Sequence, residues 1–343
     1  MSNQRFNPVF KGNGDRNPNA LDALPDPPPW RKPKQDQAQK EEIFQPSGNE
    51  VEMVNAALFL RRPLLVTGAP GVGKTSLAYA IARELDLGEV LYWPITTKTT
   101  LKDGLYSYDA IARLQDSTDK ELKGDKKFDN IGRYIRLGPL GTALLPSNKP
   151  RILVVDEIDK SDIDLPNDLL YVFEEGSFDI PELSRISDLK EEVTVGTAYK
   201  DSAEVVVKKG RVTCSEFPLV ILTSNGERAF PPPFLRRCVR LTMQKPDEKR
   251  LMDIVKAHLR QEEGGEALIA KSEERIKTLV EKFLEKQDDS SKGDLATDQL
   301  LNAIYLVTRE SGVNVSSSVE TPGGLVDRLW KYLDSSEDRV VGS

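Results

Sequence analysis

Residues 68–75 read GAPGVGKT, and this stretch constrains the fold most because it matches the pattern GxxxxGK[ST] in full. The apolar residues 63–66 before it predict a buried strand, and residues 75–87 after it have a helical periodicity that Gly88 ends. A phosphate-binding loop requires this context of strand, loop and helix. The stretch therefore predicts a nucleoside triphosphate as ligand, and the alternative is a glycine-rich turn that binds nothing.

The residue types within the loop suit both a polyphosphate and magnesium. Glycines let backbone amides approach the phosphates, and the start of the helix adds a partial positive charge. Lys74 would reach the terminal phosphates, and the hydroxyl of Thr75 would ligate magnesium. The predicted binding residues of this segment are Gly68, Pro70, Gly71, Val72, Gly73, Lys74, Thr75 and Ser76.

Two consecutive carboxylates, Asp156 and Glu157, follow the apolar run 151–155. This is the Walker B arrangement, in which Asp156 would hold magnesium and Glu157 would polarise the attacking water. The spacing of about 80 residues from the phosphate loop strengthens this interpretation. In the alternative, Glu157 only caps the next helix.

A third apolar run, 219–223, leads to Asn225. An amide at this place can hydrogen-bond both the γ-phosphate and the attacking water without adding negative charge beside the triphosphate. Because Gly226 follows, the alternative is that Asn225 is a turn residue.

Two arginines, Arg236 and Arg237, stand immediately before the last apolar run, 238–243. We expect them at the edge of the sheet, remote from the phosphate loop of their own chain. The γ-phosphate of a neighbouring subunit is then their natural target, because guanidinium groups stabilise the charge that develops in phosphoryl transfer. The alternative is a pair of surface arginines in salt bridges.

The apolar runs 63–66, 90–95, 151–155, 219–223 and 238–243 predict five strands, and helical segments separate most of them. This alternation is typical of an α/β fold with a mostly parallel five-stranded sheet covered on both faces. Ligands of such sheets bind beyond the carboxyl ends of the strands, where the motifs above are expected to gather.

The domain organisation follows from changes in composition. Residues 1–47 are rich in Pro, Asn, Asp and Lys and predict a disordered or extended arm, which is either a solvated tail or docks Phe6, Phe10 or Trp30 on a partner. Residues 48–245 form the α/β core, with a β-hairpin inserted near 191–212 and an exposed helix plus loop at 102–127. Residues 246–335 predict a small all-α domain, and 336–343 a frayed tail.

Bulk properties exclude several classes of function. The 343 residues carry 48 basic and 55 acidic side chains, and the net charge of −7 gives no general attraction to nucleic acid or to an anionic membrane. Two cysteines and one histidine cannot by themselves supply a tetrahedral metal site, and they argue against a His-based triad. No apolar run approaches a membrane span and the first residues lack a secretory layout, so a cytoplasmic protein is expected.

The order of these motifs, followed by a helical part, resembles an AAA+ ATPase. More narrowly, the chain resembles the MoxR group of the helix-2-insert clade. Residues 138–145 (GPLGTALL) are similar to the GP-containing helix of that group, and residues 156–161 followed by 165–175 resemble its helix after Walker B. The predicted hairpin lies where the clade carries an insertion. The resemblance covers residues 49–245, and the helical part matches only in its pattern.

The resemblance implies a P-loop AAA+ core with a small all-α lid, and ATP and Mg²⁺ as ligands. It also implies a homo-oligomeric ring, a hexamer, in which Lys74, Thr75, Asp156, Glu157 and Asn225 take the roles given above. Arg237 matches the arginine that precedes the last strand in relatives and is the preferred finger reaching a neighbour, with Arg236 second. Relatives act on protein clients, often together with von Willebrand factor A domain proteins.

One part of the chain departs from the family pattern. Relatives place a sensor 2 arginine at the start of a lid helix, whereas residues 294–300 contain no basic side chain. Lys292 is the nearest candidate, and Arg309 lies about four turns further along a helix. The sensor 2 residue is therefore unassigned.

Three functions compete. The first is an ATPase that remodels or activates a protein client, and the second is a slow nucleotide-dependent switch in a bacterial defence or signalling complex. The third is a GTP-driven nucleic-acid motor of the McrB type, against which the acidic net charge argues.

Overall fold

The computed structural model describes two compact units. One unit consists of Gln45–Gly68 and Lys74–Met243, and the other of Met1–Phe44, Ala69–Gly73 and Gln244–Ser343. The residues that the structure describes are 27–28, 44, 46–118, 131–201, 203–261, 264–287, 295–308, 326 and 329–330. Most of the predicted arm and the predicted tail lie outside this set, as do Phe6, Phe10, Trp30, Lys292 and Arg309.

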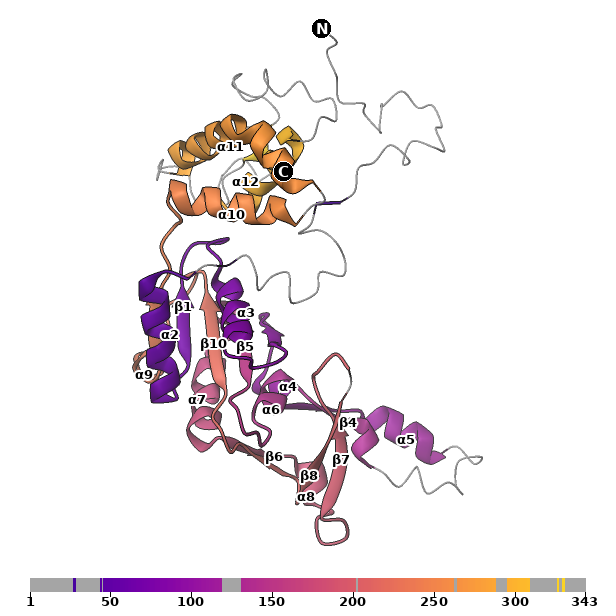
Figure 1. Ribbon diagram of the computed structural model, residues 1–343. Helices are drawn as coiled ribbons and strands as arrows, with labels where there is room; N and C mark the ends of the chain where they lie inside the picture. The colour runs from indigo at the N-terminus through magenta and orange to yellow at the C-terminus, as the bar shows by residue number, and fades with distance from the viewer. Residues whose placement is uncertain are drawn as a thin grey trace, which may run out of the picture. The chain divides into compact units, whose positions relative to one another are not determined.

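The first unit contains a five-stranded sheet in the order β11-β1-β10-β5-β2, with every neighbouring pair parallel (Figure 1). The sheet confirms the predicted α/β fold class. Each strand lies within one residue of its predicted bounds, because short apolar runs bounded by polar residues are a strong strand signal. The strands are β1 (Leu64–Thr67), β2 (Leu91–Pro94), β5 (Ile152–Asp156), β10 (Leu219–Ser224) and β11 (Val239–Thr242).

The central strands are covered on both faces. All six residues of β10 are buried, and so are the first four of β5. Successive side chains of a strand point to opposite faces, so these runs require layers on both sides. The helix α3 (Lys74–Glu84) contacts β5 and β10, and α2 (Gly48–Leu60) contacts β1 and β11. Because only β10 separates β1 from β5, the segments that follow these three strands share one edge of the sheet.

The first unit also holds a second, six-stranded sheet in the order β3-β4-β7-β8-β9-β6 (Figure 1). Within the range 191–212, β7 and β8 form an antiparallel hairpin, and their register runs from Glu192 opposite Lys208 to Gly196 opposite Glu204. The hairpin is therefore the middle of a larger sheet. The strands are β3 (Tyr106–Tyr108), β4 (Ile135–Leu137), β6 (Ser177–Asp179), β7 (Glu192–Gly196), β8 (Glu204–Lys208) and β9 (Arg211–Thr213).

Short helices connect the two sheets. The range 102–127, for which an exposed helix and a loop are predicted, holds most of α4 (Leu101–Leu105), then β3 and α5 (Ala110–Thr118), up to the last described residue before the gap. The GPLG stretch forms α6 (Pro139–Ala143), which packs closely on α4. A Cβ atom on Gly141 would lie 1.9 Å from the carbonyl oxygen of Leu105, so this approach requires glycine.

The remaining short elements of this unit are α7, α8 and α9 and two 3₁₀ turns. Their bounds are η4 (Ile131–Tyr134), η5 (Ile158–Lys160), α7 (Leu165–Glu175), α8 (Pro181–Ser184) and α9 (Pro232–Arg237). A shared apolar core lies beneath both sheets and these helices. Of these elements, α9 carries the candidate residues Arg236 and Arg237, and η5 directly follows the candidate Glu157.

The second unit is all-α in its described part, as the sequence predicts. It contains α10 (Glu248–Arg260), α11 (Gly265–Gln287) and α12 (Thr297–Thr308), and α11 contacts both other helices. Its core includes Val280 and Phe283, and Trp330 packs edge-on against Phe283 with ring centroids 5.6 Å apart. None of the described helices is long and apolar enough to cross a membrane.

Candidate nucleotide site

The loop between β1 and α3 has the backbone that glycine permits. Gly68, Gly71 and Gly73 have φ angles of 154°, 78° and 95°, in the region that side chains disfavour. Pro70 and Val72 complete this loop, and Thr75 and Ser76 follow in the first turn of α3. The backbone is thus shaped so that amides, not side chains, surround a ligand.

Lys74 is a buried cation at the start of α3, with only 8% of its surface exposed. Its ammonium group donates to the carbonyl oxygen of Gly68 at 2.8 Å and to Oδ1 of Asn225 at 2.7 Å. Burial lowers the pKa of Lys74, and the negative charges of Asp159, Asp156 and Glu157 oppose this effect. A phosphate would provide such a cation with a further anionic partner.

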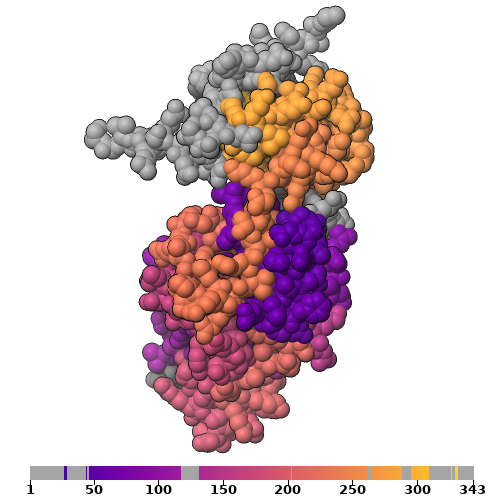
Figure 2. Space-filling model, turned by 90° about the vertical axis from the view of Figure 1, so that its left-hand side faces the viewer, coloured from indigo at the N-terminus to yellow at the C-terminus, as the bar shows by residue number. Residues whose placement is uncertain are grey.

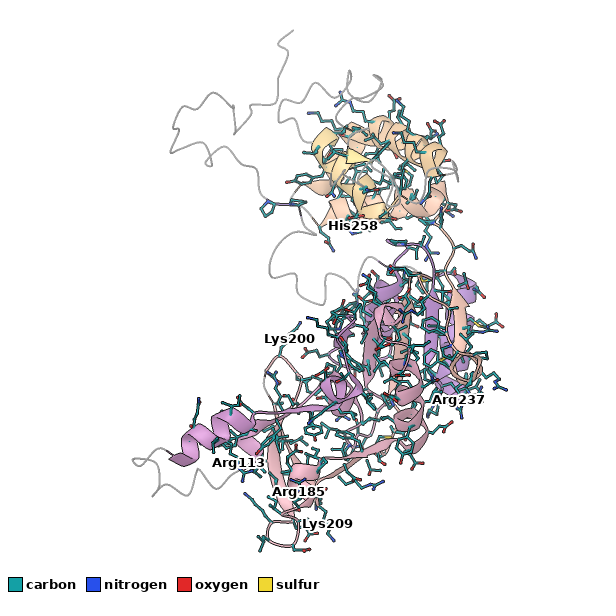
Figure 3. The ribbon with its side chains drawn as sticks, turned by 180° about the vertical axis from the view of Figure 1, so that it is seen from behind. Arg113, Arg185, Lys200, Lys209, Arg237 and His258 are labelled. Carbon is teal, nitrogen blue, oxygen red and sulfur yellow. The ribbon has the colours of Figure 1, made fainter. Side chains whose placement is uncertain are left out.

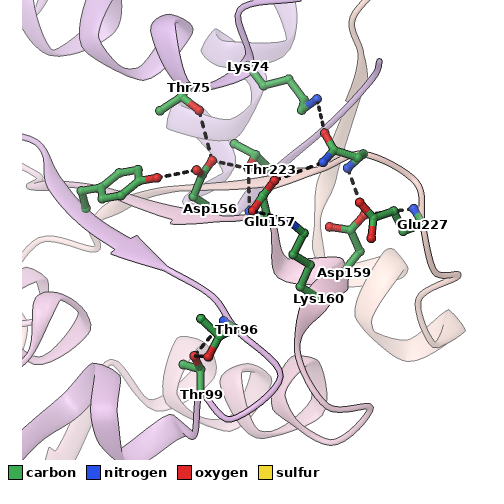
Figure 4. Close-up of polar contacts among 12 residues, drawn as sticks. Lys74, Thr75, Thr96, Thr99, Asp156, Glu157, Asp159, Lys160, Thr223 and Glu227 are labelled. Carbon is green, nitrogen blue, oxygen red and sulfur yellow. Dashed lines mark hydrogen bonds and ion pairs between the residues drawn. The ribbon is translucent and has the colours of Figure 1, made fainter. Parts of the chain in front are cut away.

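The carboxylate of Asp156 lies at the end of β5 and receives three hydroxyl hydrogen bonds (Figure 4). Thr75 Oγ1 and Thr223 Oγ1 donate to its Oδ1 at 3.1 and 2.6 Å. The hydroxyl of Tyr92 on β2 donates to Oδ2 at 2.5 Å, and burial together with the charge of Asp156 raises the pKa of Tyr92. The structure thus brings together Thr75 and Asp156, the two predicted magnesium ligands, and their hard oxygen donors fit that ion.

Glu157 adopts a left-handed backbone, with φ 58° and ψ 49°, and its amide donates to Thr223 Oγ1 at 2.9 Å. Its Oε2 accepts a hydrogen bond from Lys160 Nζ at 2.7 Å, and its Oε1 accepts one from Asn225 Nδ2 at 3.3 Å. Glu157 is the residue before the 3₁₀ turn η5, but its side chain makes no capping hydrogen bond. The helix-cap alternative therefore does not describe its side chain.

Asn225 stands between the two charged groups of the site. Its side-chain oxygen accepts from Lys74, and its side-chain nitrogen donates to Glu157. Gly226 follows with φ 80°, so Asn225 also begins a turn, as the alternative interpretation has it. The turn and the polar role coexist, because the turn uses the backbone and the site uses the side chain.

Four residues of this network are absent from the sequence prediction, namely Tyr92, Thr223, Asp159 and Lys160. A threonine near the end of a fully buried strand, just before Asn225, is a signal for Thr223. The contacts of Tyr92 depend on the pairing of β2 with β5, which puts Pro94 opposite Asp156. No sequence pattern gives that pairing.

Arg236 and Arg237 end α9, at the opposite end of the sheet from the phosphate loop. Figure 3 labels Arg237. Val239, the first residue of β11, pairs with Leu64, the first residue of β1, whereas the phosphate loop follows the last residue of β1. Arg237 forms an ion pair with Glu174 of α7, and the two side chains are 45% and 54% exposed. This chain alone thus shows the surface salt bridge that the alternative interpretation proposes for Arg237.

Arg236 is exposed, and its carbonyl oxygen accepts a hydrogen bond from Arg62 at 3.2 Å. For the sensor 2 position, residues 295–308 contain no lysine or arginine. Both candidates, Lys292 and Arg309, lie outside the described residues.

A parallel α/β sheet with a glycine loop, a buried lysine and a threonine–aspartate pair at its carboxyl edge defines a P-loop nucleotide-binding protein. Residues 63–237 match the family described as "AAA domain (dynein-related subfamily)". The chain belongs to this family of AAA+ ATPases.

Other comparisons add little. The chain is similar to a solved structure titled as a "putative ATPase" from Cytophaga hutchinsonii ATCC 33406, with 14% identity and a TM-score of 0.38. That similarity covers 79% of this chain and 70% of the other. No curated protein matches the sequence.

Proposed function

We propose that this AAA+ protein hydrolyses ATP with magnesium. The observation that carries the proposal is the continuous chain of hydrogen bonds from Lys74 through Asn225 to Glu157, beside the Thr75–Asp156 pair. It joins a lysine ammonium group, an amide and a carboxylate at one edge of the sheet. These are the groups that phosphoryl transfer to water requires.

Each residue then has one task. The loop amides and Lys74 bind the phosphates, and Thr75 and Asp156 hold magnesium, which supplies positive charge to the phosphate oxygens when bound. Glu157 accepts the proton of the attacking water, and Asn225 orients that water and the γ-phosphate. Glu157 and Lys160 form an ion pair in this structure. For Glu157 to bind the attacking water, Lys160 must therefore move aside or share the carboxylate with the water.

We further propose that the protein acts as a homo-oligomeric ring, a hexamer, in which Arg237 completes the site of a neighbour. The position of Arg237 supports this, because it lies at the opposite end of β1 and β11 from the phosphate loop of its own chain. The end of α2 (indigo in Figure 2) leads to Arg62, which hydrogen-bonds the carbonyl oxygen of Arg236, and it exposes two apolar side chains, Phe59 by 83% and Leu60 by 59%. Adjacent exposed apolar side chains support a contact site here, because contiguous apolar patches are uncommon on the surfaces of monomers.

The finer assignment is a MoxR-type protein that remodels or activates a protein client, with a von Willebrand factor A domain protein as one partner. The motif resemblance supports it, as do the short helix α6 at the GPLG stretch and the β7–β8 hairpin before β10. The client and the cytoplasmic location remain part of the proposal.

One observation favours a second candidate, a slow nucleotide-dependent switch. Both carboxylate oxygens of Glu157 already accept hydrogen bonds, one from Lys160 and one from Asn225, so neither oxygen is open to an attacking water in this arrangement. ATP hydrolysis would then be slow until the Lys160–Glu157 ion pair breaks. The nucleic-acid motor receives less support, because the hairpin cations Lys208 and Lys209 pair with Glu192 and Glu191.

Magnesium-dependent release of phosphate from ATP and from GTP by the full chain tests the proposal. We expect the rate of ATP hydrolysis per chain to rise with protein concentration as rings form. We expect Lys74→Ala to bind no nucleotide. Stimulation by a client favours the remodelling ATPase over the switch, and salt-dependent DNA binding favours the motor. Absence of binding to either triphosphate in the presence of magnesium would refute the proposal.

A further inference from the structure

Asp159 is a buried carboxylate to which the sequence analysis assigns no role. It lies in η5, three residues after Asp156, and only 3% of it is exposed. Its Oδ2 accepts hydrogen bonds from the backbone amides of Asn225 and Glu227, both at 3.0 Å. One oxygen atom therefore holds both ends of the turn that begins with Asn225 (Figure 4).

The other oxygen of this carboxylate, Oδ1, is buried and has no hydrogen-bond partner among the residues that the structure describes. A buried charge with an unsatisfied oxygen is costly unless a nearby positive charge compensates it. Lys74 supplies that charge, since Asp159 is the strongest of the acidic groups that act on it. Asp159 thus binds the Asn225 turn through Oδ2, and its charge also acts on Lys74.

The side chain of Asn225 depends on the position of its backbone. Its contact with Glu157 is 3.3 Å long, near the limit of a hydrogen bond, whereas its contact with Lys74 is 2.7 Å. A displacement of the turn by less than 1 Å would break the first contact. The amides that Asp159 holds are the only backbone donors that link η5 to this turn among the contacts found in the described residues.

We propose that Asp159 is a positioning residue, which fixes the Asn225 turn so that the amide side chain bridges Lys74 and Glu157. The inference rests on the proposed ATP hydrolysis and adds a residue to that same site. Asp159 does not touch the substrate. It acts through Asn225, and the strength of a charge-assisted hydrogen bond to two amides suits this task.

The test compares Asp159→Ala, Asp159→Asn and the control Asp162→Ala in the full chain. Asp162 is exposed, and its carboxylate bonds only the amide of Ile163 among the hydrogen bonds found. We expect Asp159→Ala to lower kcat by up to about 100-fold, as a misplaced group can, while the affinity for a fluorescent ATP analogue stays within about threefold. Asp159→Asn should lose only a few-fold in kcat, because a neutral amide oxygen still accepts the two amides. Asp162→Ala should equal the wild type.

A double-mutant cycle with Asn225→Ala separates positioning from a merely structural role. If Asp159 acts through Asn225, Asp159→Ala lowers kcat no further in the Asn225→Ala background, although it still lowers the unfolding midpoint. An equal loss of kcat in both backgrounds, or an unchanged kcat in Asp159→Ala, would overturn the inference. Should Asp159→Ala fail to fold, Asp159→Asn carries the same cycle with its smaller loss, and a wild-type kcat in that variant overturns the inference as well.

Failure of the proposed ATP hydrolysis and failure of the positioning role give different results. If the wild-type chain neither binds nor hydrolyses ATP, the proposed function fails and this inference with it. If the wild type hydrolyses ATP and Asp159→Ala does so equally well, the positioning role alone is wrong.

Discussion

The two ends of the five-stranded sheet carry charged groups under opposite conditions. At the carboxyl end, Lys74 is buried and Asp156 and Asn225 are half-buried, and hydrogen bonds within one chain join Lys74 to Asn225 and Thr75 to Asp156. At the amino end, Arg237 is half exposed and pairs with Glu174 on the surface. An exposed ion pair contributes only about 0–1 kcal/mol, so Arg237 can leave it for another partner at little cost. One end is therefore assembled in advance within a single chain, whereas at the other end Arg237 is held only by a weak surface ion pair.

Of the substitutions proposed here, Arg237→Ala should change kcat the most. Removal of a finger arginine lowers kcat by about 10³–10⁵-fold in related chemistry, and we expect a loss of that order in the assembled protein. ATP binding by each chain should be unchanged, because the binding groups lie at the other end of the sheet. Steady-state hydrolysis and equilibrium nucleotide binding measure the two quantities. Arg236→Ala is the matched control, and a larger loss there would transfer the role to Arg236.

Glu157→Gln probes the carboxyl end. Loss of a general base costs about 10²–10⁴-fold in rate, so the variant should bind ATP, assemble and hardly hydrolyse it. Single-turnover hydrolysis and size-exclusion chromatography with ATP provide the measurements. Glu175→Gln, at an exposed position of α7, is the control. Near-normal turnover by Glu157→Gln would show that the base lies elsewhere.

Glu174→Gln should have a smaller effect and in the opposite direction. It removes the charge that holds Arg237 in the single chain, so the arginine is freer to reach a neighbour. Because a surface ion pair is weak, we expect the protein concentration needed for half-maximal activity to fall by about two- to fivefold. A titration of specific activity against protein concentration detects it, and an increase in the required concentration would mean that Glu174 helps to place Arg237.

The smallest expected effect is on the pH dependence of stability, through His258 of the helical unit. This residue lies in neither group of charges at the ends of the sheet. Burial lowers the pKa of His258, the one histidine of the chain. The unfolded histidine therefore binds a proton at a higher pH than the folded one. His258 contributes stability above its unfolded pKa of about 6.5, and that contribution is lost as the pH falls.

Urea unfolding at pH 7.5 and at pH 5.5 measures this effect. The wild type should lose more stability between these values than His258→Gln does. An equal loss would show that other groups cause the pH dependence.

Sequence patterns predict the first sheet well and the second poorly. The five central strands contain four to six mostly apolar residues and are found within one residue of their ends. Four strands of the second sheet have only three residues each, too few for an alternating pattern to emerge. Only its hairpin, β7 and β8, has five residues in each strand and appears in the sequence analysis.

The same distinction holds for the site. Motif residues such as Thr75 and Asp156 are predicted because local spacing and the topology of parallel strands put them at one edge. Tyr92 and Asp159 are not predicted. The contacts of Tyr92 depend on the pairing of β2 with β5, and those of Asp159 follow the left-handed backbone of Glu157. The pair of Arg237 with Glu174 joins two helices 63 positions apart and has no sequence signature.

The central claim is that one subunit binds the triphosphate and the arginine of the next completes its cleavage. Mixing Glu157→Gln with Arg237→Ala tests it most directly, because each protein retains the group that the other lacks. Random mixing of equal amounts places an intact Glu157 beside an intact Arg237 at about a quarter of the interfaces of a ring. The account predicts that neither variant hydrolyses ATP alone and that the mixture does. A mixture as inactive as its components, or full turnover by an isolated wild-type monomer, would contradict it.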